Sequence, residues 1–223
     1  MTETVLIFDF DGTLADSRKT LVEIANNLAL EFGFDRVTED EMLRLSHLSS
    51  RDIFYQSPIP SYKIPFLLRR VKKELNQKIA SLQPFDGIKE ALNSLKTEGY
   101  RLGIVTSNLK ENVVDFLDNN NLEEYFDFVY SASSLFGKHK ILKKIIKKHH
   151  LCVDKIIYVG DETRDIEAAK KSKIKVVAVT WGFNSASVLT EYKPDFLIHK
   201  PQELTEIINF YQYNNNLISQ NLI

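Results

Sequence analysis

Two aspartates, two residues apart, follow an apolar run near the start of the chain. Residues 5–8 are Val-Leu-Ile-Phe, and Asp9-Phe10-Asp11-Gly12-Thr13 comes directly after them. Such a run bounded by glycine is typical of a buried strand, and residues two apart on a strand point to the same side. Because an unpaired buried charge is costly, a bound cation or a catalytic role best explains two acids at this point.

These two acids could carry out phosphoryl transfer. Asp9 could attack phosphorus as a nucleophile and form an aspartyl-phosphate, which divides a difficult displacement into two easier steps. Asp11 could protonate the leaving oxygen and then activate water. Gly12 lets the backbone turn sharply after the strand. The alternative for the pair taken alone is an acidic turn without a function.

A second polar group, Thr106-Ser107-Asn108, ends the expected strand at 101–106 and precedes a helical pattern. A hydroxyl and the free N–H groups at a helix start suit an anionic oxygen. Ser and Asn are also ordinary helix caps, and this alternative stays open for the group taken in isolation.

A lysine-rich helix is expected at 138–150, directly after Phe136-Gly137. Lys138 precedes this helix and could turn toward the strand ends, where a compact positive charge would neutralise a phosphate. The other lysines of the run are expected to lie on the exposed helix face.

Two more aspartates lie in the segment Gly160-Asp161-Glu162-Thr163-Arg164-Asp165. Asp161 falls at the end of an expected strand and Asp165 in the first turn of a helix. Together with Asp9 they would give an oxygen-rich site that suits a hard cation such as Mg²⁺. Asp165 has an alternative reading as an acid favourably placed at a helix N-terminus.

Alternating strand and helix patterns position these groups from residue 86 onward. Such alternation predicts an α/β fold with a mostly parallel sheet, whose strands end at one edge where ligands bind. Strands are expected at 5–8, 101–106, 126–131, 155–160, 175–180 and, at the edge, 195–199. Helices are expected at 86–98, 110–120, 138–150, 163–172 and 201–211.

Residues 17–83 interrupt the alternation with one helical pattern after another. Helices are expected at 20–32, 39–45, 51–55 and 63–82. We therefore predict a helical cap at 17–83, inserted into a core formed by 1–16 and 84–211. Residues 212–223, which are rich in asparagine, are expected to form a flexible tail.

Composition narrows the class of protein. The 223 residues include 43% apolar residues, enough for a sizeable core. A formal net charge of −1, from 29 basic and 30 acidic residues, argues against a nucleic-acid partner. The one cysteine, Cys152, rules out an intrachain disulfide. No apolar stretch approaches a membrane span or a signal peptide, so a cytoplasmic protein without a membrane partner is expected.

The four polar groups, in this order, resemble the motifs of the haloacid dehalogenase-like (HAD) superfamily of hydrolases. They read DFDGTLADS at 9–17, IVTSN at 104–108, FGK at 136–138 and GDETRD at 160–165. The resemblance extends to about Leu204 and implies a Rossmann-like core, with helices on both faces of the sheet and a helical cap inserted after the first strand. The second aspartate, Asp11, is absent from dehalogenases and is a threonine in P-type ATPases, so neither class is expected. The layout is most similar to phosphoglycolate phosphatase-like members.

The resemblance also implies a role for each motif residue. Asp9 would be the nucleophile and a metal ligand, and Asp11 the general acid/base and a ligand through its carbonyl oxygen. Lys138 would hold the nucleophile and the phosphoryl group, although His139 follows it where many relatives have proline. The remaining implied roles are phosphate binding for Thr106, Mg²⁺ binding for Asp161, and assistance to the metal, directly or through water, for Asp165. Ser107, Asn108 and Gly12 are further candidates for phosphate contacts.

The predicted function is a Mg²⁺-dependent phosphatase that hydrolyses a small soluble phosphomonoester, such as a phosphoglycolate-like compound, a sugar phosphate or a nucleotide. The alternatives are a phosphosugar mutase resembling β-phosphoglucomutase and a non-catalytic binding protein that keeps the fold. Within the cap, Arg51 is the preferred candidate for an anion contact. A small phosphorylated metabolite is the expected partner, and a monomer or homodimer the expected state.

Overall fold

The computed structural model describes residues 4–132, 134 and 136–220 of the chain. Over these residues six strands form one parallel sheet, in the order β3-β2-β1-β4-β5-β6. The predicted α/β fold with a parallel sheet is therefore confirmed. The strands are β1 (Val5–Phe8), β2 (Arg101–Thr106), β3 (Phe128–Ser131), β4 (Ile156–Gly160), β5 (Lys175–Val179) and β6 (Phe196–Ile198).

Strand β1 lies at the centre of the sheet, and its neighbours end level with it. Phe8 pairs with Ile104 of β2 on one side and with Val159 of β4 on the other. Asp9 continues the ladder, because its N–H donates to the Val159 carbonyl at 2.8 Å. The residues that follow β1, β2 and β4 are thus brought to one edge of the sheet, although these strands end at positions 8, 106 and 160 of the chain.

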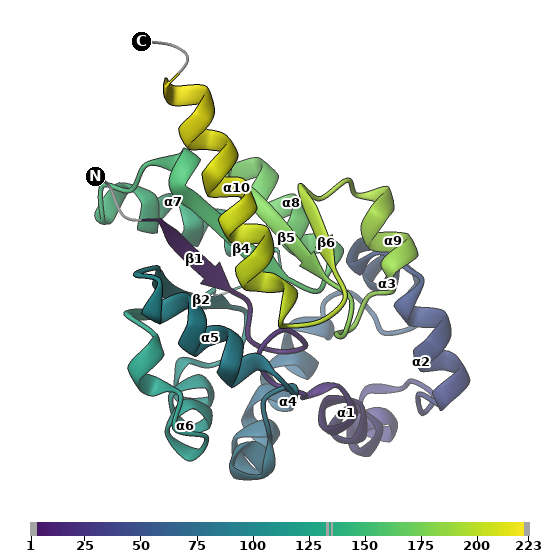
Figure 1. Cartoon of the computed structure of the whole chain (residues 1–223). Helices are drawn as coiled ribbons and strands as arrows, with labels where there is room; N and C mark the ends of the chain where they lie inside the picture. Colours follow the sequence, from purple (N-terminus) through teal and green to yellow (C-terminus); the bar gives the residue numbers. More distant parts are fainter. Residues whose placement is uncertain (1–3, 133, 135, 221–223) are drawn as a thin grey trace.

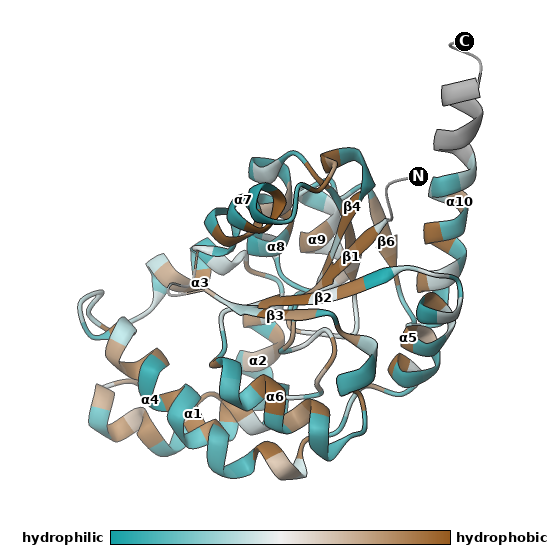
Figure 2. Cartoon of the chain, turned by 90° about the vertical axis from the view of Figure 1, so that its left-hand side faces the viewer, coloured by the Kyte–Doolittle hydropathy of each residue, from teal (hydrophilic) through white to brown (hydrophobic). Residues whose placement is uncertain are grey.

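Helices cover both faces of the sheet, and the alternation of β1 shows how. Leu6 and Phe8 belong to one apolar cluster, with side chains of α5, α6 and α10. Val5 and Ile7 belong to the other, with side chains of α7, α8 and α9. Figure 2 shows the apolar strands enclosed between these helices. The helices are α5 (Ile88–Thr97), α6 (Lys110–Asn119), α7 (Lys138–Lys148), α8 (Thr163–Ser172), α9 (Ala186–Glu191) and α10 (Glu203–Gln220).

Four further helices lie beyond the edge where β1 ends, on the side toward which its arrow points in Figure 1. They are α1 (Arg18–Phe32), α2 (Glu39–Ser46), α3 (Ser50–Gln56) and α4 (Ile64–Lys78). The single helix expected at 63–82 ends at Lys78 and continues as a short 3₁₀ turn, Ile79–Ser81. Pro84 disfavours helical geometry at Gln83, so the helical segment could not have continued far beyond this turn.

The two connections between these helices and the sheet are bonded to each other. Ala15 and Pro84 form an antiparallel bridge. Beside it, the Asp16 N–H donates to the Gln83 carbonyl at 3.0 Å, and the Phe85 N–H to the Leu14 carbonyl at 3.1 Å. The chain therefore leaves the sheet and returns to it at a single place.

The C-terminal helix is longer than predicted. A helix at 201–211 followed by a flexible tail was expected, whereas α10 continues to Gln220. The asparagines at 214–216 suggested an end, but asparagine in a helix costs only about 0.7 kcal/mol relative to alanine. The segment contains no glycine or proline to stop the helix. Among the described residues, no helix is both long and apolar enough to cross a membrane.

Candidate active site

Asp9 lies at the end of the central strand with 1% of its surface exposed. Its Oδ2 is 2.6 Å from the Lys138 ammonium. Its Oδ1 is buried and has no hydrogen-bond partner among the residues that the structure describes. Burial raises the pKa of Asp9 to about 7, and the nearby Lys138 limits the increase. One oxygen of this carboxylate is thus held by a cation, and the other is left for a ligand.

Lys138 is the first residue of α7 and is as deeply buried as Asp9. Its ammonium also lies 2.6 Å from Asp165 Oδ1, so it bridges two carboxylates. Burial alone would lower the pKa of Lys138, but the charges of Asp165 and Asp9 outweigh it and the pKa is raised. The lysine is therefore a fixed positive charge between the end of β1 and the start of α8.

Asp11 lies beyond the strand and has different partners. Ser17 donates its hydroxyl to Asp11 Oδ1 at 2.9 Å, and the Asn108 side-chain amide donates to Oδ2 at 2.8 Å. Burial raises the pKa of Asp11, against the two hydrogen bonds, which lower it. The two aspartates are therefore distinguished by their environment: Asp9 is paired with a cation, and Asp11 with neutral donors.

Asp161 is buried in a space that glycines leave open. Its Oδ1 accepts from the Thr13 hydroxyl at 2.8 Å and its Oδ2 from the Phe183 N–H at 2.7 Å. A Cβ on Gly12 or Gly182 would come within 2.3 or 2.2 Å of Asp161 Oδ2. Gly12 also has a φ of 79°, which glycine adopts without strain. Burial, followed by the charge of Glu162, raises the pKa of Asp161 well above its ordinary value.

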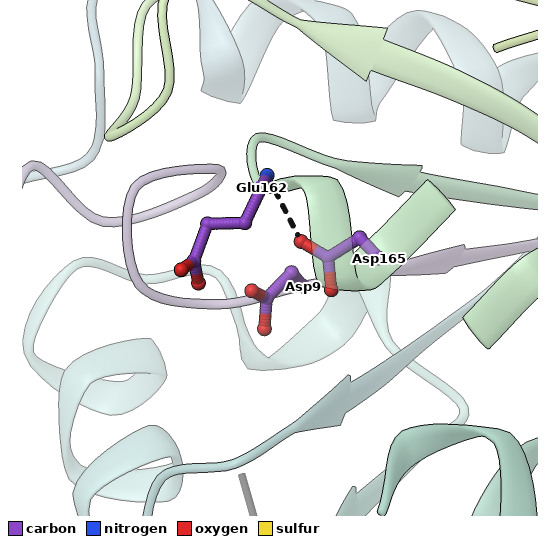
Figure 3. A group of neighbouring side chains, drawn as sticks. All are labelled: Asp9, Glu162 and Asp165. Carbon is purple, nitrogen blue, oxygen red and sulfur yellow. Dashed lines mark hydrogen bonds between the residues drawn. The ribbon is translucent and has the colours of Figure 1, made fainter. Parts of the chain in front are cut away.

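Three acids, Asp9, Glu162 and Asp165, gather where a cation could be held. One carboxylate oxygen of each lies within 4.8 Å of those of the others. Figure 3 shows the three side chains converging, with the Glu162 N–H donating to Asp165 Oδ2 at 3.2 Å. Carboxylate oxygens suit a hard divalent cation, and Asp9 offers Oδ1, which has no hydrogen-bond partner among the described residues.

This group differs from the set expected from the sequence. Asp9 and Asp165 come together as expected, and Glu162 joins them. The side chains of Asp11 and Asp161 form the hydrogen bonds described above, and the expected contact of Asp11 with the metal, through its backbone carbonyl, stays a prediction. Glu162 lies in the GDETRD segment, where the sequence predicts roles only for Asp161 and Asp165. It is the N-cap of α8, in a reciprocal arrangement with Asp165.

The Thr106-Ser107-Asn108 segment is buried beside Asp11. Thr106 accepts the Asn108 N–H at 3.0 Å, and Ser107 accepts a hydrogen bond from the Arg164 guanidinium at 3.4 Å. Arg164 also pairs with Glu162. Sequence reasoning did not single out Arg164, because an arginine in the first turn of a helix is ordinarily exposed.

Arg51, the arginine preferred in the helical segment, is paired with an acid. Its guanidinium donates to both carboxylate oxygens of Glu167 in α8, at distances from 2.8 to 3.1 Å. It also lies 5.1 Å from the centre of the Phe136 ring. The neighbouring Ser50 N–H donates to Thr163 Oγ1 at 2.9 Å. Arg51 thus connects α3 to α8.

Two cavities lie between α3, α4 and the sheet edge. One has a volume of about 230 Å³ and includes Glu162 and Arg164 in its lining. The other has a volume of about 580 Å³ and is lined in part by Lys72 and Ser131. Phe54, Ile64 and Leu68 line both. A small ligand could therefore enter beside the acids, between apolar side chains and basic groups.

Comparison with known proteins agrees with this arrangement. The pattern of the haloacid dehalogenase-like hydrolase family matches residues 6–179. The chain belongs to this family. It is 36% identical over 203 residues to a phosphoglycolate phosphatase from Synechococcus elongatus, covering 91% of this chain and 96% of the relative. It is 24% identical over 210 residues to the pyrophosphatase PpaX of Listeria innocua, covering 92% and 96%.

A solved structure supports the fold. A haloacid dehalogenase-like hydrolase from Streptococcus pneumoniae superposes with a TM-score of 0.77 at 24% identity, covering 92% of this chain and 98% of the other. The predicted resemblance to HAD-superfamily, phosphoglycolate phosphatase-like enzymes is confirmed, and so is the prediction that the chain is a hydrolase.

Proposed function

We propose that this HAD-family hydrolase is a Mg²⁺-dependent phosphatase that acts on a small soluble phosphomonoester through a phosphoenzyme at Asp9. The observation that carries the proposal is the state of the Asp9 carboxylate. It is buried at the end of the central strand, with one oxygen on Lys138 and the other without a partner among the described residues.

In the first step Asp9 attacks phosphorus, and the bond from phosphorus to the ester oxygen breaks. Asp11 gives its proton to that leaving oxygen. In the second step a water oxygen attacks the phosphoenzyme and passes a proton back to Asp11. The bond from phosphorus to Asp9 then breaks and inorganic phosphate leaves. The raised pKa of Asp11 suits this exchange, because a carboxyl must hold a proton before it can donate one.

Lys138 supports both steps as a buried positive charge beside the reacting carboxylate. Its charge favours the ionised form of Asp9 and limits the rise of the pKa that burial causes, and its bond to Asp165 fixes its position. Thr106, Ser107, Asn108 and the backbone at Gly12 stay our candidates for phosphate contacts, and Arg164, bonded to Ser107, joins them.

A divalent cation would be held by Asp9 with Glu162 and Asp165, the acids that converge on it. When bound, Mg²⁺ would neutralise negative charge on the phosphoryl oxygens. Asp161, the ligand expected from the motif, would have to exchange its bonds to Thr13 and Phe183 for the cation. Calorimetric titration of Mg²⁺ into Glu162→Gln and Asp161→Asn proteins distinguishes the two arrangements, since only loss of a true ligand weakens binding strongly.

The substrate is proposed to be small, because α1–α4 would act as a cap over the sheet edge and leave cavities of about 230 and 580 Å³. The Synechococcus relative supports a phosphoglycolate-like ester, with sugar phosphates and nucleotides as the other classes to test. A cytoplasmic location and a monomeric or homodimeric state stay predictions.

Turnover of an aryl phosphate tests the proposal. We expect Asp9→Asn to abolish phosphate release while circular dichroism shows an intact fold, and we expect EDTA to stop the wild type and Mg²⁺ to restore it. Near-normal activity of Asp9→Asn would refute the nucleophile, and metal-independent hydrolysis would refute the cation.

A panel of phosphorylated metabolites, ranked by kcat/KM, then identifies the substrate class. Isomer formation with a bisphosphate primer, in place of phosphate release, would favour the mutase alternative. A folded protein that binds these esters without turning any of them over would favour the binding protein.

A further inference from the structure

A chain of three asparagine amides runs from helix α4 to Asp11. The Asn76 side chain donates to Asn112 Oδ1 at 2.9 Å, Asn112 donates to Asn108 Oδ1 at 2.9 Å, and Asn108 donates to Asp11 Oδ2 at 2.8 Å. Asn112, in the first turn of α6, has none of its surface exposed. A buried polar side chain at the centre of such a chain costs stability unless its bonds are made.

Backbone groups fix the direction of this chain. The Asn112 amide nitrogen also donates to the Lys72 carbonyl at 2.9 Å, and a carbonyl can only accept. Asn108 Oδ1 also accepts the Leu109 N–H at 2.7 Å, which can only donate. The nitrogen of the Asn108 amide must therefore face Asp11, and the usual ambiguity of an amide flip is removed.

The orientation of the Asn108 amide distinguishes the two carboxyl oxygens of Asp11. Oδ2 faces an N–H donor, so it cannot carry a proton toward Asn108 without losing that bond. Oδ1 faces the Ser17 hydroxyl, which can donate or accept. Of the two oxygens, Oδ1 is therefore the one whose partner can adapt to a proton.

We propose that Asn112 is a positioning residue for Asp11, an inference that rests on the proposed phosphatase function. Asn112 holds the Asn108 amide so that Asp11 Oδ2 is kept as an acceptor and Oδ1 is left to exchange the proton with the leaving group. Asn112 also accepts a hydrogen bond from Asn76 and donates one to the Lys72 carbonyl, and both of these residues belong to α4. The placement of Asp11 therefore also depends on the position of α4.

The test uses two esters that need the proton to different degrees. An aryl phosphate with an acidic phenol as its leaving group departs without much help, whereas an alkyl phosphate needs a proton donor. We expect Asn112→Leu, which keeps the number and branching of the side-chain heavy atoms but removes the bonds, to lower kcat/KM about tenfold for the alkyl ester and under about threefold for the aryl ester. Asn119→Leu is the matched control on the exposed face of α6, and it should change neither value.

Equal losses for the two esters, or no loss, would overturn the proposal. If Asn112→Leu does not fold, Asn112→Ser should give the same difference between the esters, because a single hydroxyl cannot make all three bonds.

A measurement without substrate separates this proposal from the proposed function. The Asn108 side-chain amide protons should exchange slowly with solvent in the wild type and faster in the Asn112 variants, as followed by NMR. Unchanged exchange would refute the positioning role even if neither ester were hydrolysed. A wild type that hydrolyses neither ester with Mg²⁺ would refute the phosphatase and leave the exchange result to decide the role of Asn112.

Discussion

Replacing Asp9 by asparagine should abolish activity and stabilise the fold at neutral pH. Burial raises the pKa of Asp9 from its ordinary value of 3.8 to about 7. The folded state therefore binds the Asp9 proton more tightly than the unfolded state, and the wild type loses stability as the pH rises from 3.8 to 7. Asparagine does not titrate, so the variant escapes this loss.

The magnitude follows from the pKa difference of about three. Each unit of pKa corresponds to 1.36 kcal/mol, which gives a ceiling of about 4 kcal/mol at pH 8. The variant also loses the attraction between Asp9 and Lys138, although Lys138 keeps its bond to Asp165. We therefore expect the stability advantage of Asp9→Asn to grow by about 2 to 4 kcal/mol between pH 4 and pH 8.

Urea denaturation of the metal-free proteins in EDTA, at pH 4, 6 and 8, measures this advantage. Subtracting the wild-type free energy of unfolding removes the contribution of titrating groups remote from Asp9, and what remains is the effect of Asp9 together with its charged neighbours. Asp35→Asn, at an exposed aspartate, is the matched control and should differ from the wild type by less than about 0.5 kcal/mol throughout. An Asp9→Asn advantage that stays constant or shrinks as the pH rises would show that the carboxylate is not strained by burial.

Three other changes test the surroundings of the site. Lys138→Met should destabilise the fold by about 3 to 5 kcal/mol at pH 8, because Asp9 and Asp165 lose their shared cation. The loss, measured by urea denaturation, should be smaller at pH 4, because Asp9 is then protonated and needs no cationic partner. Gly182→Ala should cost about 1 to 3 kcal/mol in the same assay, since its Cβ would lie 2.2 Å from Asp161 Oδ2, and a neutral result would mean that Asp161 turns away freely. Arg51→Ala should cost only about 0.5 kcal/mol, because its ion pair with Glu167 is partly exposed, and should leave KM unchanged, whereas a tenfold rise in KM would place Arg51 on the substrate.

The sheet and the polar groups at its edge were predictable because apolar runs define the strands. The apolar runs before Asp9 and before Asp161 form β1 and β4, which are neighbours in the sheet. Because the two strands are parallel, the residues that follow them lie at the same edge. The roles of side chains that depend on rotamers were not predictable in this way. Asp161 and Glu162 are adjacent and both acidic, and the sequence does not show that Asp161 packs against Gly12 and Gly182 while Glu162 joins Asp9 and Asp165.

The amide chain through Asn112 was likewise beyond the sequence, because it joins residues of α4 and α6 whose separation in space depends on the packing of the inserted helices. Arg51 is a similar case. Its charge predicted a contact with an anion, and in the structure that anion is the carboxylate of Glu167.

The paired connections at 14–16 and 83–85 determine how α1–α4 could move. Because the two connections are hydrogen-bonded to each other, neither can shift at this point without the other unless these bonds break. Asp11 forms a bridge with Ala15, which belongs to the first connection. We therefore expect a displacement of α1–α4 at this point to be transmitted to Asp11.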